Sequence, residues 1–153
     1  MLALFEALGR TAPGEFLRDS TLAFALTEAA HLLALSLIGG VVAAIGFSTA
    51  GVVVRRDLAP DLARALRPVF WIALVLVVVS GIGLVSAGPY KYYSNPVFWV
   101  KLQLLLGAVL TYLLVDYAVS GGKVERWQWR IVALPFLVVW LAVAVAGRLI
   151  GLI

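Results

Sequence analysis

Apolar residues fill four long stretches of the chain, and short polar segments separate them. The stretches run from about Thr21 to Ser48, from Val69 to Ala87, from Pro96 to Val119 and from Trp129 to Ile153. A helix needs roughly 20 apolar residues to cross a hydrocarbon core of about 30 Å. The pattern therefore predicts an all-α protein, folded as a four-transmembrane-helix bundle.

Residues 1–20 do not follow this pattern. A short amphipathic stretch, Met1 to Arg10, is followed by a predicted turn at residues 11–14 and by a polar segment that ends near Asp19. Glu6 interrupts the apolar run early, which is not typical of a signal peptide. We expect residues 1–20 to form an N-terminal interfacial segment with a short helix, and residues 21–153 to form the four-helix transmembrane domain.

Composition supports a membrane protein. The chain is 63% hydrophobic and 13% charged, with a mean hydropathy of +1.06, far from the balance of a soluble domain. It contains no cysteine, which excludes disulfides, thiolate metal sites and a cysteine nucleophile. The net charge of +4 does not indicate a nucleic-acid partner, because the basic residues lie in short loops between the predicted spans.

Those basic residues predict the orientation of the bundle. They crowd the loops after the first and third spans, at Arg55, Arg56, Arg64, Arg67, Lys123, Arg126 and Arg130. Loops rich in Lys and Arg stay in the cytoplasm. We therefore expect a multi-pass protein of the bacterial inner (cytoplasmic) membrane, with both termini and the loop at residues 88–95 outside.

Four ionisable residues interrupt the spans: Glu28, His31, Lys101 and Arg148. At 1.5 Å of rise per residue, each lies roughly 7 to 15 Å from the outer end of its span. Glu28 and His31 share a helix face, because they are three residues apart. An ionisable group inside a membrane is kept where it has a partner or a use. These residues form the candidate site, in an outward-facing polar pocket.

Two interpretations of this cluster stay open. In the structural one, Glu28 pairs with Arg148 or Lys101 as a brace, His31 hydrogen-bonds a neighbouring carbonyl, and Lys101 extends towards the interface. In the functional one, one acid faces two cations, so the remaining positive charge favours an anionic group such as a carboxylate or a haem propionate. Tyr90, in the outer loop, is either an interface anchor or a hydrogen-bond donor to the ligand.

Three kinds of ligand chemistry can be compared at this site. Glu28-x-x-His31 resembles half of a di-iron carboxylate site, which needs a second copy and more carboxylates. His31 alone suffices as the axial ligand of a five-coordinate haem b. Glu28 and His31 together are an alternative site for copper or a proton.

Several segments resemble a known pattern. They are Glu28-x-x-His31, the Trp71 span with Ser80-Gly81, Asn95-Pro96-x-Phe98-x-x-Lys101, and Trp140 with Gly147-Arg148-Leu149-Ile150. From Gly14 onward the chain resembles a bacterial family of small four-helix membrane proteins of unknown function. It is more loosely similar to the membrane domain of copper resistance protein D. The resemblance implies that Glu28, His31, Asn95, Lys101 and Arg148 act together, and the single histidine departs from relatives that bind haem through histidine pairs.

We expect a cofactor-binding membrane subunit, with haem as the leading cofactor, or a redox-associated subunit. A small copper- or proton-handling transport protein and a structural subunit of a larger membrane complex are the alternatives. Small residues on the first span, Gly39, Gly40 and Gly46, favour close helix contact. We therefore expect the lipid bilayer as surroundings, and a homo-oligomer or a larger complex as the assembled form.

Overall fold

The computed structural model describes residues 2–50, 58–121 and 128–150, with side chains for residues 2–50, 58–119 and 133–147. Four long helices lie in this part of the chain: α3 (Thr21–Ala50), α4 (Ala59–Ala87), α6 (Pro96–Gly121) and α7 (Gln128–Ile150). Three of them, α3, α4 and α6, are long and apolar enough to cross a membrane, and the described apolar portion of α7 is Ala133–Gly147. The predicted all-α bundle is confirmed.

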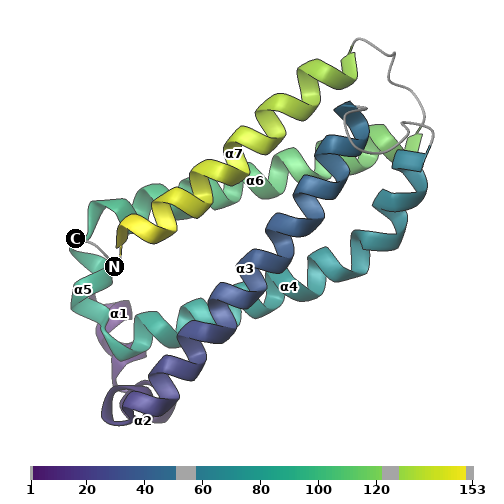
Figure 1. Cartoon of the computed structure of the whole chain (residues 1–153). Helices are drawn as coiled ribbons and strands as arrows, with labels where there is room; N and C mark the ends of the chain where they lie inside the picture. Colours follow the sequence, from purple (N-terminus) through teal and green to yellow (C-terminus); the bar gives the residue numbers. More distant parts are fainter. Residues whose placement is uncertain (1, 51–57, 122–127, 151–153) are drawn as a thin grey trace.

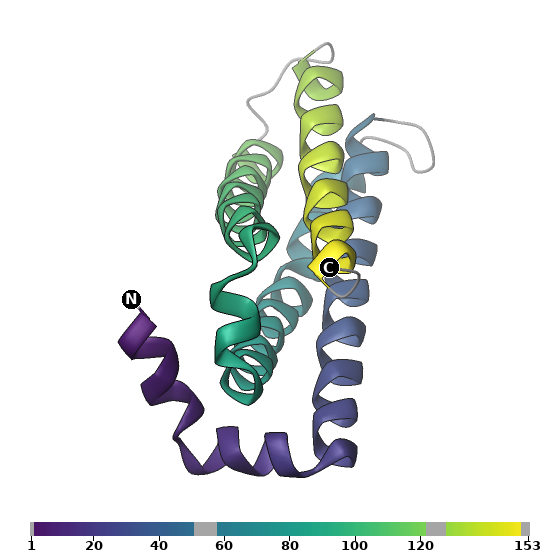
Figure 2. The same cartoon turned by 90° about the vertical axis from the view of Figure 1, so that its left-hand side faces the viewer.

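The four helices form two antiparallel pairs, α3 with α4 and α6 with α7 (Figure 1). The pairs meet mainly where α3 packs on α7, while α4 and α6 touch less extensively. Three shorter helices, α1 (Leu2–Gly9), α2 (Ala12–Asp19) and α5 (Pro89–Tyr93), lie together at one end of the bundle (Figure 2). We call this the short-helix end, and the opposite one, where α4 begins, the basic end.

Helix α4 begins earlier than the sequence predicts. It starts at Ala59 rather than near Val69, and Pro68 lies inside it. The expected boundary was set by loss of hydrophobicity around Arg64 and Arg67. These arginines instead lie on the first turns of α4 and extend the helix beyond its apolar part. Helix α5 likewise replaces part of the expected loop at residues 88–95.

The N-terminal segment forms two helices rather than one. The predicted turn at residues 11–14 was wrong in position, because α2 already begins at Ala12. Thr11 caps it, with the Thr11 Oγ1 accepting a hydrogen bond from the Gly14 amide at 3.4 Å. Proline in the first turn is compatible with this start, since the first amides of a helix need no intrahelical partner. The expected short N-terminal helix is present as α1.

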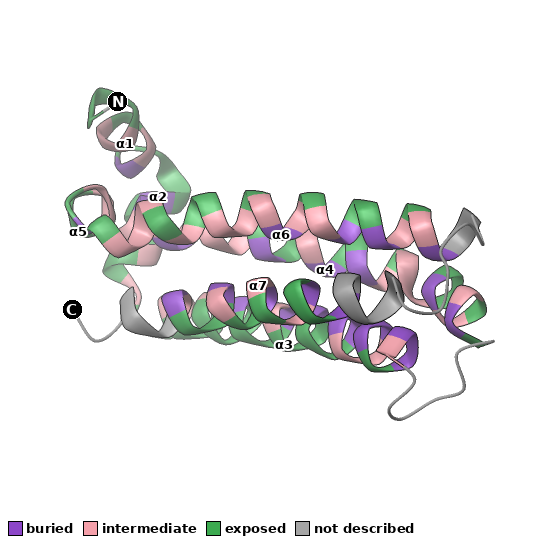
Figure 3. Ribbon diagram, turned by 90° about the horizontal axis from the view of Figure 1, so that it is seen from above, coloured by how far each residue is buried: buried purple, intermediate pink, exposed green. Residues whose placement is uncertain are grey.

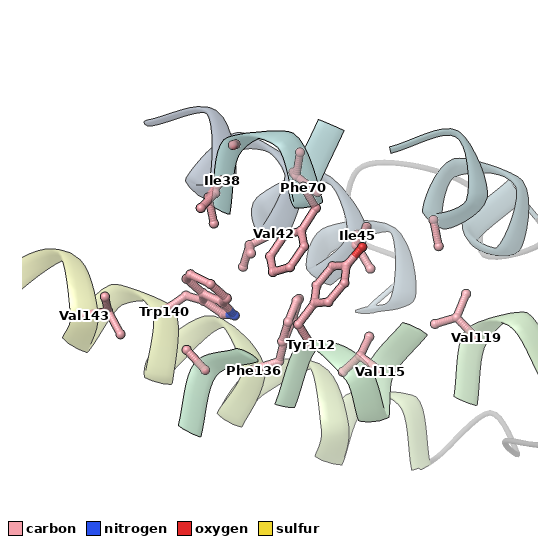
Figure 4. Close-up of a cluster of buried hydrophobic side chains, with 14 of the residues drawn as sticks. Ile38, Val42, Ile45, Phe70, Tyr112, Val115, Val119, Phe136, Trp140 and Val143 are labelled. Atoms are coloured by element: carbon pink, nitrogen blue, oxygen red, sulfur yellow. The ribbon is translucent and has the colours of Figure 1, made fainter. Parts of the chain in front are cut away.

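The apolar core occupies mainly the half of the bundle nearer the basic end (Figures 3 and 4). Its centre is a stack of Phe70 from α4 on Tyr112 from α6, with ring centroids 3.4 Å apart, and Trp140 from α7 meets Phe70 edge-on. On α6, the residues Ala108, Tyr112, Val115 and Val119 are buried. No residue from 96 to 107 is buried. The half of α6 near the short-helix end is therefore loosely packed, and we call this part of the bundle the open half.

Candidate functional site

His31 lies inside the open half, buried between α3 and α4. Its Nδ1 is 2.9 Å from the Ser80 Oγ, and a Cβ added at Gly81 would lie 3.3 Å from the His31 Cε1. Small residues on α4 therefore let the imidazole approach the helix backbone. The His31 ring therefore packs against Ser80 and Gly81.

The hydrogen bond between His31 and Ser80 bears on the tautomer of the imidazole. The Ser80 Oγ donates its own proton to a backbone carbonyl, that of Leu76 at 2.5 Å or of Val77 at 3.3 Å. A Ser80 hydroxyl that donates there can accept a hydrogen bond from His31, an arrangement that requires the tautomer with the proton on Nδ1. A neutral imidazole with a protonated Nδ1 presents an unprotonated Nε2, which is the form that binds a metal.

Lys101 reaches the same half from α6. It is partly buried, and its ammonium is close enough to exert an electrostatic effect on His31. A Cβ at Gly147 of α7 would lie 3.3 Å from the Lys101 Nζ. Among the described residues, no hydrogen bond or ion pair satisfies this ammonium. His31, Ser80, Lys101 and Gly147 thus bring all four long helices to one polar layer.

Glu28 stands apart from this layer. Its side chain is exposed, and no ion pair joins it to Lys101 in the described residues. Its carboxylate acts on Tyr92 of α5, whose pKa is raised by burial and, to a lesser extent, by the Glu28 charge. Glu28 and His31 are three residues apart on α3, but their side chains therefore have different neighbours: Tyr92 for Glu28 and Ser80 for His31.

Tyr90 and Asn95 have structural contacts of their own. The Tyr90 hydroxyl donates to the Glu6 Oε1 at 2.7 Å and joins α5 to α1. The buried Asn95 accepts a hydrogen bond from the Val97 amide at 2.9 Å, which caps the start of α6. Neither contact involves His31. The Arg148 side chain, the expected partner of Glu28, lies outside the described residues.

A family model matches residues 18–153, nearly the whole chain, and its description is a family of unknown function, DUF6644. The chain belongs to this family. No curated protein and no solved structure matches the chain, so nothing links it to copper resistance protein D. The DUF6644 family is one of unknown function, so membership in it assigns no activity to the site.

Sequence reasoning placed His31 and Lys101 at similar depth, and the structure brings them into one layer of this DUF6644 protein. It did not include Ser80, Gly147 or Tyr92 in the site. The signal for Ser80 and Gly147 was present, since small residues in a span mark places where another group comes close. No group of three His, Cys, Asp or Glu residues suited to a metal ion occurs within the described ranges.

Proposed function

We propose that the protein is a membrane subunit that binds a cofactor carrying an anionic group in the open half of its bundle. Haem b is the cofactor to test first, with His31 as axial ligand and Lys101 as the partner of a propionate. The observation that carries this proposal is the hydrogen bond of His31 Nδ1 to Ser80, which leaves Nε2 unprotonated. A single such nitrogen suffices for a five-coordinate haem.

The chemistry of His31 and Lys101 suits haem b. The Lys101 ammonium has no described anionic partner, and a charge-assisted hydrogen bond to a carboxylate would supply one. The loose packing of α6 between residues 96 and 107 leaves this half able to admit a ligand between the helices. An apolar groove of about 350 Å³ also lies between α6 and α7, lined by Pro96, Val97, Val100, Ala142, Val145 and Ala146, and neither His31 nor Lys101 lines it.

Each residue has a distinct part in the proposal. Haem b would supply one-electron chemistry at its iron. His31 would bind it, and Ser80 would hold the imidazole in the required tautomer. Lys101, and from the sequence Arg148, provide the positive charge for its acidic groups. A subunit of this kind has a redox-associated role.

The copper or proton alternative has less support. It rests on Glu28 and His31 acting together at one site. In the described residues Glu28 is exposed and near Tyr92, whereas His31 is buried against Ser80. We therefore place haem ahead of copper. A purely structural subunit is the remaining alternative, with the polar layer as its brace.

We further propose that the protein resides in the bacterial inner membrane with both termini outside. The support is the concentration of basic residues in the sequence between α3 and α4 and between α6 and α7, together with Arg64 and Arg67 on the start of α4. This orientation would open the polar layer towards the outside. Assembly as a homo-oligomer or within a larger complex stays a prediction, because lipid also covers exposed apolar side chains.

The visible spectrum of the purified protein tests the proposal. We expect a Soret band that His31→Ala abolishes and a loss of haem affinity of about tenfold in Lys101→Met, equal to roughly 1.4 kcal/mol. Lys91→Met removes an exposed lysine of α5 and is the matched control. A folded, colourless preparation that takes up no added haem would contradict the proposal. Metal analysis of the same sample tests the copper alternative.

A further inference from the structure

A second polar feature lies at the short-helix end, away from His31. It is an open pocket of about 460 Å³ bordered by α1, α2, the end of α4 and α5. Its lining residues are Glu6, Gly9, Arg10, Arg18, Ala87, Gly88, Pro89, Tyr90 and Lys91. The proposed cofactor site uses none of these contacts.

The charge of this pocket is positive. Arg10 and Arg18 are the two basic residues of the N-terminal segment, and Lys91 is the basic residue of the α4–α6 connection. All three line the pocket, with Glu6 as the single acid. The Glu6 carboxylate already accepts the Tyr90 hydroxyl hydrogen bond. Three cations against one carboxylate give a net charge suited to an anion.

The walls of the pocket are held by contacts within the chain. The Arg18 Nη2 donates to the Gly9 carbonyl at 2.7 Å and its Nε donates to the Ala87 carbonyl at 3.2 Å. Gly9 touches Pro89 so closely that a Cβ there would lie 2.8 Å from the Pro89 Cγ. Phe5 packs against the rings of Tyr93, Phe98 and Trp99. The short helices are therefore fixed around the pocket before any ligand binds.

The surroundings of the pocket favour an amphipathic anion. Leu4 of α1 and Phe16 of α2 are 67% and 64% exposed, and both helices precede a membrane span. Short helices with exposed apolar residues at the end of a bundle lie in the headgroup region of a bilayer. At that level, cationic side chains can form charge-assisted hydrogen bonds to the phosphate of an anionic lipid headgroup.

We propose that this pocket binds the phosphate headgroup of an anionic glycerophospholipid, with Arg10 and Lys91 as its mobile cations and Arg18 as a fixed wall. The acyl chains would lie against the exposed apolar residues of α1 and α2. A bound lipid would then fasten the N-terminal segment to the bundle. This site is independent of the proposed cofactor site.

The test uses the full chain purified in detergent and titrated with a short-chain phosphatidylglycerol, with the matching phosphatidylcholine and with inorganic phosphate. Native mass spectrometry measures the bound lipid and thermal unfolding measures stabilisation. We expect one phosphatidylglycerol to bind more tightly than phosphatidylcholine and to raise the Tm. Arg10→Gln and Lys91→Gln should each weaken it about fivefold, without changing the Tm of the lipid-free protein.

Arg64→Gln is the control, because Arg64 is an exposed arginine at the basic end and its loss should leave phosphatidylglycerol binding unchanged. Equal binding of the two lipids, or equal losses in all three variants, would overturn the proposal. Inorganic phosphate that raises the Tm as much as phosphatidylglycerol would also overturn it, since the occupant would then be a free anion.

Discussion

The guanidinium of Arg67 on α4 forms a hydrogen-bonded ion pair with the carboxylate of Asp116 on α6. The Arg67 Nη2 lies 3.0 Å from Oδ1 and 2.9 Å from Oδ2 of Asp116, and the Arg67 Nε lies 3.3 Å from Oδ1. Helices α4 and α6 otherwise touch less extensively than the other neighbouring pairs of long helices. The ion pair therefore joins the two helices at the basic end, one turn from the Phe70–Tyr112 stack.

Removing the acid should weaken this connection. The Asp116 side chain is 14% exposed and that of Arg67 is 42% exposed, so the pair lies between a surface and a buried ion pair. We expect Asp116→Asn to lower the free energy of unfolding by about 1–2 kcal/mol. Unfolding in detergent measures this loss. Asp61→Asn, which removes the exposed partner of Arg64, should have almost no effect, and equal losses would contradict the prediction.

The Tyr112 hydroxyl offers a different test of the core. It is buried, and it has no hydrogen-bond partner among the described residues. Removing an unpaired buried hydroxyl costs nothing, so Tyr112→Phe should keep or raise the free energy of unfolding, by up to about 1 kcal/mol. Tyr112→Leu removes the stack on Phe70 as well and should lower it by about 2 kcal/mol. A marked loss in Tyr112→Phe would mean that the hydroxyl has a partner in solution.

The sequence predicted the architecture well, because each span is a continuous apolar run of sufficient length. It predicted less about the site. Depth along a helix can be counted from the sequence, which is why His31 and Lys101 were grouped correctly. The rotation of each helix about its axis depends on packing between helices, and the apolar faces here are nearly uniform. The sequence therefore could not show that Glu28 is exposed or that Tyr90 contacts Glu6.

The Ser80 hydroxyl is predicted to control the tautomer of His31. In Ser80→Ala the imidazole loses its acceptor at Nδ1, so haem affinity should fall by about tenfold while the fold is kept. Ser36→Ala is the matched control, because Ser36 donates to the Leu32 carbonyl in the same way but on an exposed face. The Soret absorbance during a haem titration of both variants measures the effect. Equal affinities would remove Ser80 from the site.

The contact of Tyr90 with Glu6 should depend on alkaline pH. The hydrogen bond to the Glu6 carboxylate, together with its negative charge, raises the pKa of Tyr90 above its ordinary value of 10.0. A raised pKa in the folded state means that the bond stabilises the protein fully below about pH 10 and is lost as the pH rises through the raised pKa. The tyrosinate absorbance of the wild type minus that of Tyr90→Phe reports this transition. In Glu6→Gln it should move to lower pH, and an unchanged transition would show that the contact does not form.

The orientation of the bundle can be tested with reporter fusions. Arg64 lies near the start of α4 and Tyr92 lies in α5, so the apolar length of α4 separates them. Fusions after Arg64 should report the cytoplasm and fusions after Tyr92 should report the outside, because basic residues are retained on the cytoplasmic side. Two fusions in the same compartment would contradict α4 as a span. The reverse assignment would place the polar layer of His31 and Lys101 near the cytoplasm, and a ligand would then have to enter that layer from inside the cell.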